Sequence, residues 1–145
     1  MLETFKGLLV TLRELFKKSV TIPYPLEKRE TYPTTRWLHE LKRYDNGLER
    51  CIGCALCAAN CPVHCIYVEA GENTDEQRFS PGERYATVYE INMSRCIFCG
   101  YCEDACPTEA IVLEKNYELA DTDRDRMIYT KDMLLVKGKG PQDGG

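Results

Sequence analysis

Hydrophobic residues at the start of the chain recur with the spacing of an α-helix. Over residues 2–18 the apolar side chains are separated by three and four positions, and charged side chains occupy the other faces. This spacing predicts an amphipathic helix, because a helix turns once in about 3.6 residues. Pro23 and Pro25 prevent its continuation. We expect residues 1–22 to form an anchoring helix whose apolar stripe meets a partner subunit or a membrane interface; the alternative is that it covers the chain's own core.

The next segment, residues 23–45, combines three prolines with aromatic and charged side chains. This composition favours an extended connector, with one short helical turn around residues 35–42, that becomes ordered on another surface. Its aromatic residues suit an interface, although Trp37 is equally compatible with packing onto its own domain.

Three short runs further along predict strands. Residues 84–91, RYATVYEI, have the alternating β-branched and aromatic character of a strand. The runs IYVE (66–69) and IVLE (111–114) each follow a cysteine-rich segment, and we expect them to pair as strands. The polar, turn-rich residues 70–84 predict a loop. We expect residues 116–145 to form a C-terminal extension with a flexible, glycine-rich end.

The length and charge narrow the possible functions. With 145 residues the chain offers one domain's worth of core. The net charge of −4 is unevenly distributed, because residues 1–50 carry +3 and residues 51–145 carry −7. An acidic second half would repel a phosphate backbone, so we expect no nucleic-acid partner. No apolar run approaches the length of a membrane-spanning helix, and the first ten residues lack the basic region of a secretory signal.

Eight of the nine cysteines belong to two copies of one pattern. CIGCALCAANCP begins at Cys51, and CIFCGYCEDACP begins 45 positions later at Cys96. Each copy reads C-x2-C-x2-C-x3-C-P. Three thiolates at this spacing fit one loop that curls around a small inorganic body, which is a poor match to a single tetrahedral zinc ion. The run resembles that of bacterial ferredoxins, so we expect two [4Fe-4S] clusters as cofactors, with structural zinc as the less favoured alternative.

In two-cluster ferredoxins the fourth cysteine of each run serves the other cluster. On that rule one cluster takes Cys51, Cys54, Cys57 and Cys106, and the second takes Cys96, Cys99, Cys102 and Cys61. These eight are the predicted metal-binding and cofactor-binding residues. Ligation across the repeat would join the two halves, which a core of this size needs. We expect a dry lining from four isoleucines, Ile52, Ile66, Ile97 and Ile111.

Three other residues, Cys65, His64 and His39, are of types that bind metals, but we do not expect them to be ligands. Cys65 corresponds to Ala110 in the second copy, so its position needs no sulfur, and we expect an inert buried thiol. His64 corresponds to Glu109, and we expect a solvated side chain beside a cluster. We expect the same of His39, which lies in the connector.

The expected fold class is α+β. A bacterial two-[4Fe-4S] ferredoxin-like domain with pseudo-two-fold symmetry would span residues 46–115, with the amphipathic helix and extended termini outside it. The sequence has no nucleophile–base motif, phosphate-binding loop or HExxH helix, so we expect no catalytic residues. Two redox centres without a substrate site indicate an electron carrier.

Beyond the ferredoxin runs, three segments resemble the two-cluster iron–sulfur subunit of respiratory complex I, the 23-kDa-type subunit of NADH:quinone oxidoreductase. These segments are ERCIGCALCAANCP, GERYATVYEINMSRCIFCGYCEDACPTEAIVL and YELADTDRDRMIYTKDMLL. The resemblance implies a relay subunit of a proton-translocating enzyme, passing electrons from the NADH-oxidising arm toward the terminal cluster and the quinone. It also implies hydrophilic-arm, quinone-site and membrane-arm partners and a peripheral location on the cytoplasmic side of the cell membrane.

Two alternatives use the same ferredoxin module. One is the equivalent subunit of a membrane-bound hydrogenase or formate-oxidising complex, which composition does not distinguish from complex I. The other is a free soluble ferredoxin, for which the residues before Cys51 and the amphipathic helix would have no use.

Overall fold

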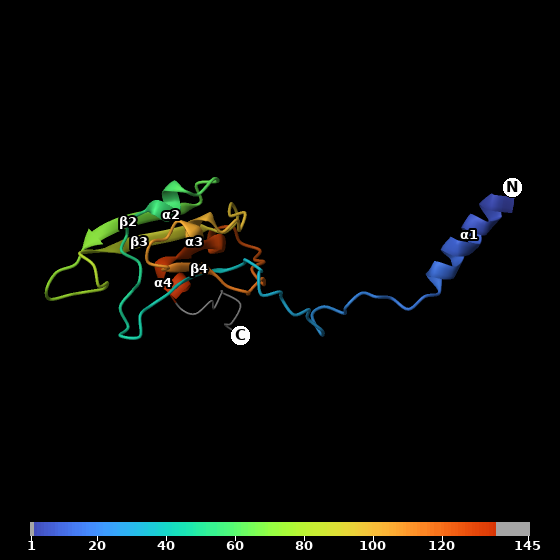
Figure 1. Ribbon diagram of the computed structural model, residues 1–145, viewed down its shortest axis with the longest axis horizontal. Coiled ribbons are helices and arrows are strands. Elements are labelled where there is room, and N and C mark those ends of the chain that lie inside the picture. Colours follow the sequence, from blue (N-terminus) through green and yellow to red (C-terminus); the bar gives the residue numbers. More distant parts are fainter. Residues whose placement is uncertain (1, 136–145) are drawn as a thin grey trace. The chain divides into compact units, whose positions relative to one another are not determined.

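The computed structural model describes residues 2–135 and divides into two units, Met1–Thr31 and Tyr32–Gly145. Figure 1 labels α1 of the first unit and most elements of the second. None of the described helices has the length and apolar character needed to cross a bilayer. The predicted flexible end at residues 136–145 lies outside the described residues.

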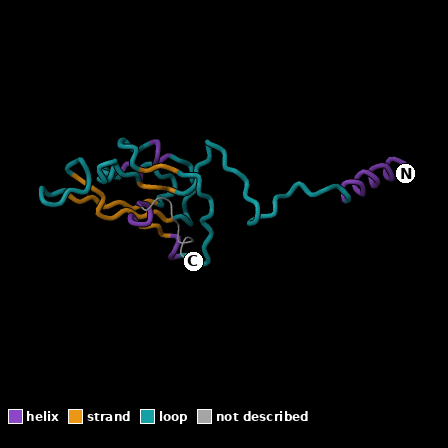
Figure 2. Tube along the Cα trace, turned by 90° about the horizontal axis from the view of Figure 1, so that it is seen from below, coloured by secondary structure: helices purple, strands orange, loops and turns teal. Residues whose placement is uncertain are grey.

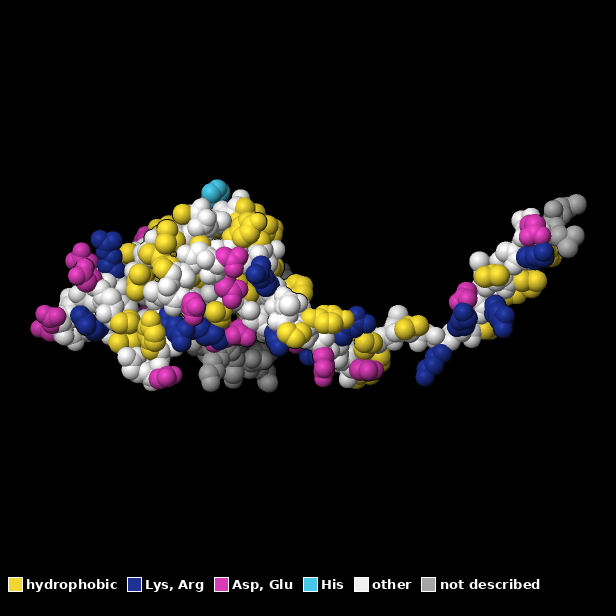
Figure 3. Space-filling model, in the orientation of Figure 1, with side chains coloured by type: hydrophobic (Ala, Val, Ile, Leu, Met, Phe, Trp, Pro, Cys, Tyr) yellow, Lys and Arg dark blue, Asp and Glu magenta, His cyan; other side chains and the backbone are white. Residues whose placement is uncertain are grey.

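The first unit contains helix α1, Leu2–Leu15. The helix ends at Leu15, earlier than the pattern over residues 2–18 predicts. A turn follows, in which the backbone N–H of Lys17 donates to the carbonyl of Glu14. The apolar side chains of α1 are exposed, from 50% at Leu12 to 75% at Leu15. Figure 3 shows them in yellow along the helix, beside charged side chains.

The larger sheet of the second unit has three antiparallel strands in the order β2-β3-β5. Its long members are β2, Ile66–Glu72, and β3, Arg84–Asn92, which form a hairpin, and β5 is Ile128–Thr130. Figure 2 shows the strands in orange among long loops. The predicted strand at 84–91 is confirmed, whereas β2 continues to Glu72 into the segment predicted to be a loop.

A register shift at Glu69 and Ala70 decides which residues of β3 are buried. Val88 pairs with Glu69 and Ala86 pairs with Ala70, so Thr87 is an extra residue on β3. Such a bulge reverses the alternation of side chains. Ala86 and Tyr89 are therefore both buried although three positions separate them, and Tyr89 points into the core beside the cysteines.

The second sheet shows that two of the predictions are wrong. It pairs β1, His39–Leu41, with β4, Ile111–Leu113. The runs 66–69 and 111–114 therefore do not pair with each other: β2 pairs with β3, and β4 pairs with β1. The helical turn expected around residues 35–42 is also wrong. That segment is extended because its backbone hydrogen bonds go to β4 and to the residues just after it, such as Trp37 N–H to the Glu114 carbonyl.

Four short helical elements complete the unit. They are α2, Leu56–Ala59; α3, Tyr101–Asp104; the 3-10 helix η1, Asp125–Met127; and α4, Lys131–Leu135. α2 and α3 lie within the two cysteine runs at equivalent positions and contact each other. α4 contacts β1 and β3.

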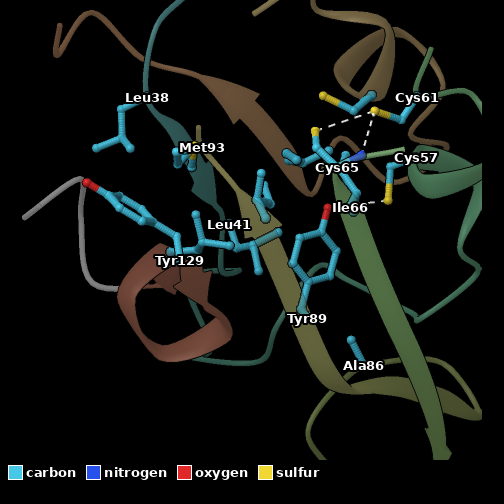
Figure 4. Packing of buried hydrophobic residues seen from close by; sticks show 14 residues of the cluster. Leu38, Leu41, Cys57, Cys61, Cys65, Ile66, Ala86, Tyr89, Met93 and Tyr129 are labelled. Atoms are coloured by element: carbon cyan, nitrogen blue, oxygen red, sulfur yellow. Dashed lines mark hydrogen bonds between the residues drawn. The ribbon is translucent and has the colours of Figure 1, made fainter. Parts of the chain in front are cut away.

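The C-terminal strand and helix belong to the core. Tyr129 of β5 and Leu134 of α4 are 3% and 1% exposed, and Figure 4 shows Tyr129 beside Leu41. Lys131 fixes this segment further. Its Nζ lies 2.8 Å from Glu49 Oε2 and donates to the carbonyl of Ala86 at 2.7 Å. The described part of the predicted C-terminal extension is thus joined to the residues just before Cys51.

The two cysteine runs share an unusual backbone. Positive φ angles occur in both at positions 45 residues apart: Gly53 and Phe98, Ala55 and Gly100, and His64 and Glu109. Non-glycine residues rarely adopt such angles. Their matched occurrence shows that the two loops follow the same path.

Gly53 is required for two reasons. Its φ is +65°, and a Cβ at this position would lie 2.7 Å from the carbonyl oxygen of Tyr85 in β3. Gly47 offers a contrast, because its φ is +83° but no atom lies within 4 Å of the position of a Cβ. A side chain at residue 53 would therefore strain the backbone and push the first cysteine loop away from β3.

Gly53→Ala should destabilise the protein more than Gly47→Ala. Both substitutions place a Cβ at positive φ, at a cost of about 1–2 kcal/mol, and only the first also meets the Tyr85 carbonyl. Since 1 kcal/mol lowers the Tm of a domain of this size by about 4–8 °C, we expect Gly53→Ala to lower it by at least about twice as much as Gly47→Ala. Thermal unfolding of the holoprotein, followed by circular dichroism, measures the difference. Equal Tm values would contradict the close approach of loop and strand.

Candidate metal centre

Cysteine side chains from both runs surround two hollows. The first hollow, about 330 Å³ and partly open to solvent, is lined by Cys51, Cys54, Cys57 and Cys106. The second hollow, about 270 Å³, is lined by Cys61, Cys65, Cys96, Cys99 and Cys102. Each hollow receives three cysteines of one run and the fourth cysteine of the other. The structure thus brings together the two sets that the spacing predicts, and adds Cys65 to the second.

The isoleucines predicted to line the clusters do so. Ile52 and Ile111 line the first hollow, and Ile66 and Ile97 line the second. The lining is not equally dry, because Ile111 is 1% exposed whereas Ile97 is 59% exposed. Apolar surroundings and solvent access both affect the potential of a metal centre.

Backbone N–H groups are directed at the fourth cysteine of each run. Cys65 N–H donates to Cys61 Sγ at 3.4 Å, and Ala110 N–H donates to Cys106 Sγ at 3.2 Å. Burial acts to raise the pKa of both thiols, but these and neighbouring backbone donors outweigh it, so each pKa lies below its usual value. These two sulfurs are therefore prepared to be thiolates, the form of cysteine that binds metals.

Other cysteines have the opposite environment. Burial raises the pKa of Cys51 to about 11 and the pKa of Cys102 to about 12, and neighbouring cysteine sulfurs add to both shifts. Four thiolates in one apolar hollow repel one another unless positive charge lies among them. Without positive charge nearby, these two thiols therefore favour the protonated form.

The donor sets and the space fit an iron–sulfur cluster. Thiolate ligands select soft metals and iron–sulfur clusters, and cysteine sulfurs from both runs face each hollow. Within residues 2–135, no three His, Cys, Asp or Glu side chains are gathered as ligands of a single ion. The sulfurs stand around a space instead, as a polynuclear group requires.

Tyr89 is a neighbour of the first hollow that its sequence context did not reveal. Its hydroxyl lies 3.3 Å from Cys57 Sγ, and the side chain is 1% exposed (Figure 4). Burial, followed by the proximity of Cys57, raises its pKa well above the usual value. Only the bulge in β3, which the sequence pattern does not show, turns Tyr89 toward the cysteines.

His39 differs from its prediction. It is 2% exposed rather than solvated, it lines the second hollow, and its Nε2 lies 3.9 Å from Cys96 Sγ. Burial lowers its pKa to about 4, so the imidazole is neutral at physiological pH. The prediction was wrong because it placed His39 in a loose connector, whereas pairing of β1 with β4 carries it into the core.

His64 and Cys65 agree better with expectation. His64 is exposed. Cys65 is buried, as expected of an inert thiol, but its Sγ lies 3.5 Å from Cys61 Sγ (Figure 4), and burial raises its pKa. Cys65 is thus a neighbour of the predicted ligand set, and its counterpart Ala110 in the second copy has no sulfur.

Comparison with solved structures gives a match to a chain from the membrane-bound sulfane sulfur reductase, an archaeal respiratory membrane complex. The two chains are 34% identical and superpose with a TM-score of 0.53. The match covers 81% of the present chain and 56% of the other, so the present chain spans little more than half of that protein's length.

Comparison with protein families gives a match to the 4Fe-4S dicluster domain over residues 50–110. This region contains both cysteine runs, the hairpin β2–β3 and every cysteine that lines the two hollows. Residues 50–110 are therefore a 4Fe-4S dicluster domain, and the cofactors of this protein are two [4Fe-4S] clusters.

Proposed function

We propose that this chain is the electron-transfer subunit of a respiratory membrane complex. The observation that carries the proposal is the three-plus-one grouping of cysteines around two neighbouring hollows within a dicluster domain. The similarity to a chain of an archaeal respiratory membrane complex supports a role as one subunit among several. When bound, the two clusters supply one-electron carriers. The protein holds them, limits the access of water and sets their potentials.

The eight predicted cysteines are the proposed ligands. The first hollow would hold its cluster by Cys51, Cys54, Cys57 and Cys106, and the second by Cys61, Cys96, Cys99 and Cys102. Contact between α2 and α3 supports close spacing of the two centres, because these helices carry Cys57 and Cys102. Short separation is what electron transfer within a subunit needs.

We also propose a pseudo-two-fold relation between the halves of the dicluster domain. The three pairs of positive φ angles at a spacing of 45 residues support it, as do the equivalent positions of α2 and α3. Crossed ligation is a natural consequence of such a relation, because the fourth cysteine of each half then meets the centre of the other half.

Among respiratory complexes we propose NADH:quinone oxidoreductase, in which the chain would relay electrons to the terminal cluster and quinone and have no substrate site of its own. The supporting observation is the resemblance of GERYATVYEINMSRCIFCG and YELADTDRDRMIYTKDMLL to its two-cluster subunit. A second candidate is the corresponding subunit of a complex that reduces sulfane sulfur, favoured by the 34% identity to a chain of such a complex.

Affinity purification of the tagged chain from membranes distinguishes the candidates. Co-purifying flavin with NADH-dependent quinone reduction would support NADH:quinone oxidoreductase. Sulfane sulfur reduction would favour the second candidate, and nickel or formate oxidation would favour a hydrogenase or formate-oxidising complex. A chain that purifies alone from the soluble fraction would be a free ferredoxin and would contradict the membrane complex.

Helix α1 is the proposed contact with the membrane surface, on the cytoplasmic side. Its exposed apolar side chains, including Phe5, Leu8 and Leu12, support this role, since no residue of the first unit covers them. Lys17 and Lys18, just after its end, would favour anionic lipid headgroups.

Cys106→Ala should remove the cluster bound by the first cysteine run, although Cys106 belongs to the second run. The reason is that its sulfur lines the first hollow. We expect low-temperature EPR of the reduced holoprotein to retain one of two [4Fe-4S] signals, with iron content falling by about half.

Cys65→Ala is the matched control, because Cys65 lies within the second hollow but is not a proposed ligand. It should retain both signals. Assignment of the lost signal requires a second variant, Cys54→Ala, which should remove the same signal as Cys106→Ala. If the two variants remove different signals, the crossed ligation is wrong.

Deleting residues 1–20 should release the protein from membranes without loss of either cluster. The deletion removes α1 but no residue of the second unit. Sedimentation of membranes washed at neutral pH measures the bound fraction. Leu8→Ser with Leu12→Ser, which preserves chain length, should weaken binding in the same direction. A truncated chain that still sediments with membranes would contradict the anchoring role.

A further inference from the structure

Each hollow has a deeply buried side-chain donor that is not a cysteine and reaches a cysteine sulfur. The first hollow has a further, half-buried donor, because the Thr108 hydroxyl lies 3.6 Å from Cys106 Sγ. At the first hollow Tyr89 Oη lies 3.3 Å from Cys57 Sγ. At the second hollow His39 Nε2 lies 3.9 Å from Cys96 Sγ. Both side chains are almost fully buried, at 1% and 2% exposure. Burial of a polar group this deeply costs free energy unless the group has a hydrogen-bond partner. The contacts with the two cysteine sulfurs provide that partner for Tyr89 and for His39.

The direction of the Tyr89 hydrogen bond follows from its partner. A thiolate that ligates metal carries no proton, so Cys57 Sγ accepts and the phenol donates. A phenol carries its proton at neutral pH, because its ordinary pKa is about 10. The donor therefore persists throughout the physiological pH range.

The tautomer of His39 follows from the same reasoning. Among residues 2–135 its buried Nδ1 has no partner. If Nδ1 carried the proton, a buried donor would be unsatisfied and the lone pair of Nε2 would face the Cys96 sulfur. With the proton on Nε2, the ring donates to the thiolate and only an acceptor is left unpaired. The Nε2–H form is favoured on both counts.

Strand β1 makes the two hollows chemically different. His39 and Leu41 are two residues apart and so lie on the same face of the strand. His39 lines the second hollow, and Leu41 lines the first. One strand thus presents a hydrogen-bond donor to one centre and a hydrocarbon side chain to the other, while β3 supplies Tyr89 only to the first.

We propose that Tyr89 and His39 are positioning residues that raise the reduction potentials of the two clusters separately, Tyr89 through Cys57 and His39 through Cys96. Hydrogen bonds to cluster sulfurs are one of the factors that set these potentials. Adding one electron increases the negative charge on the sulfur ligands, so a donor stabilises the reduced form more than the oxidised form. No bond is formed or broken, and both protons stay on their side chains. The inference rests on the ligand sets of the proposed function.

Tyr89→Phe tests the first half, because it removes the hydroxyl and keeps the ring. Tyr129→Phe is the matched control, since Tyr129 is also buried but lines neither hollow. The measurement is an EPR-monitored redox titration of the full-length holoprotein, with the signal lost in Cys106→Ala assigned to the first hollow. One hydrogen bond is worth a factor of about five in an equilibrium constant. We therefore expect Tyr89→Phe to lower the potential of the first cluster. At the wild-type midpoint potential, the ratio of its reduced to its oxidised form should fall by up to about fivefold, and Tyr129→Phe should leave this ratio unchanged.

His39→Leu tests the second half and should lower the potential of the other cluster alone. The shift should be smaller than that of Tyr89→Phe, because the contact of 3.9 Å is longer than that of 3.3 Å. His39→Gln, which retains an N–H donor, should restore part of the potential. If His39 acted through packing alone, the potential would not be higher in His39→Gln than in His39→Leu.

Two outcomes would overturn the inference while leaving the ligand sets intact. One is unchanged potentials in Tyr89→Phe and His39→Leu when iron content equals that of the wild type. The other is an equal shift of both clusters in either variant, which would indicate a general structural effect. Failure of the ligand sets gives a different result, namely that Cys106→Ala and Cys54→Ala remove different signals.

Discussion

Bonds between cysteine thiolates and iron are the interaction on which the rest of this protein depends. Each hollow takes three sulfurs from one run and one from the other, so on the proposed ligand sets each cluster would join residues 35 to 55 positions apart. The buried hydrocarbon core is small, and Cys57, Cys61, Cys65 and Cys102 are themselves members of it. In a domain of this size metal–thiolate bonds supply cohesion that apolar burial does not. The same bonds would fix the carriers in place, so the proposed ligand sets give stability and electron transfer one structural origin.

The segments around the dicluster domain complete its surroundings. β1 pairs with β4 and brings His39 and Leu41 to the two hollows, while β5 and α4 close the opposite side of the core. Lys131 links that C-terminal segment to Glu49, two residues before the first cysteine. On the other side, Arg36 donates to the carbonyl of Cys99 at 2.9 Å. The flanking segments therefore act on the clusters' environment, and the two centres need not have the same potential.

The cysteine sets and the isoleucine lining could be predicted from the sequence because the repeat itself carries the information. The spacing of the cysteines determines which sulfurs of one loop can face the same space. The two copies have the same cysteine spacing, so both loops are expected to hold their sulfurs in the same way. The strand at 84–91 was predictable from its alternation. β1 and β5 were not, because each has three residues and exists through hydrogen bonds to a distant partner. Tyr89 and His39 were missed for related reasons: a bulge turns one inward, and a short strand buries the other.

Iron and acid-labile sulfide analysis of the anaerobically purified, full-length protein tests the central claim most directly. Two complete clusters predict about eight irons and about eight sulfides per chain, without stoichiometric zinc. About four irons would mean that only one hollow holds a cluster. Zinc in place of iron, with no sulfide, would contradict the account, because the hollows would then be structural sites and the chain would carry no electrons.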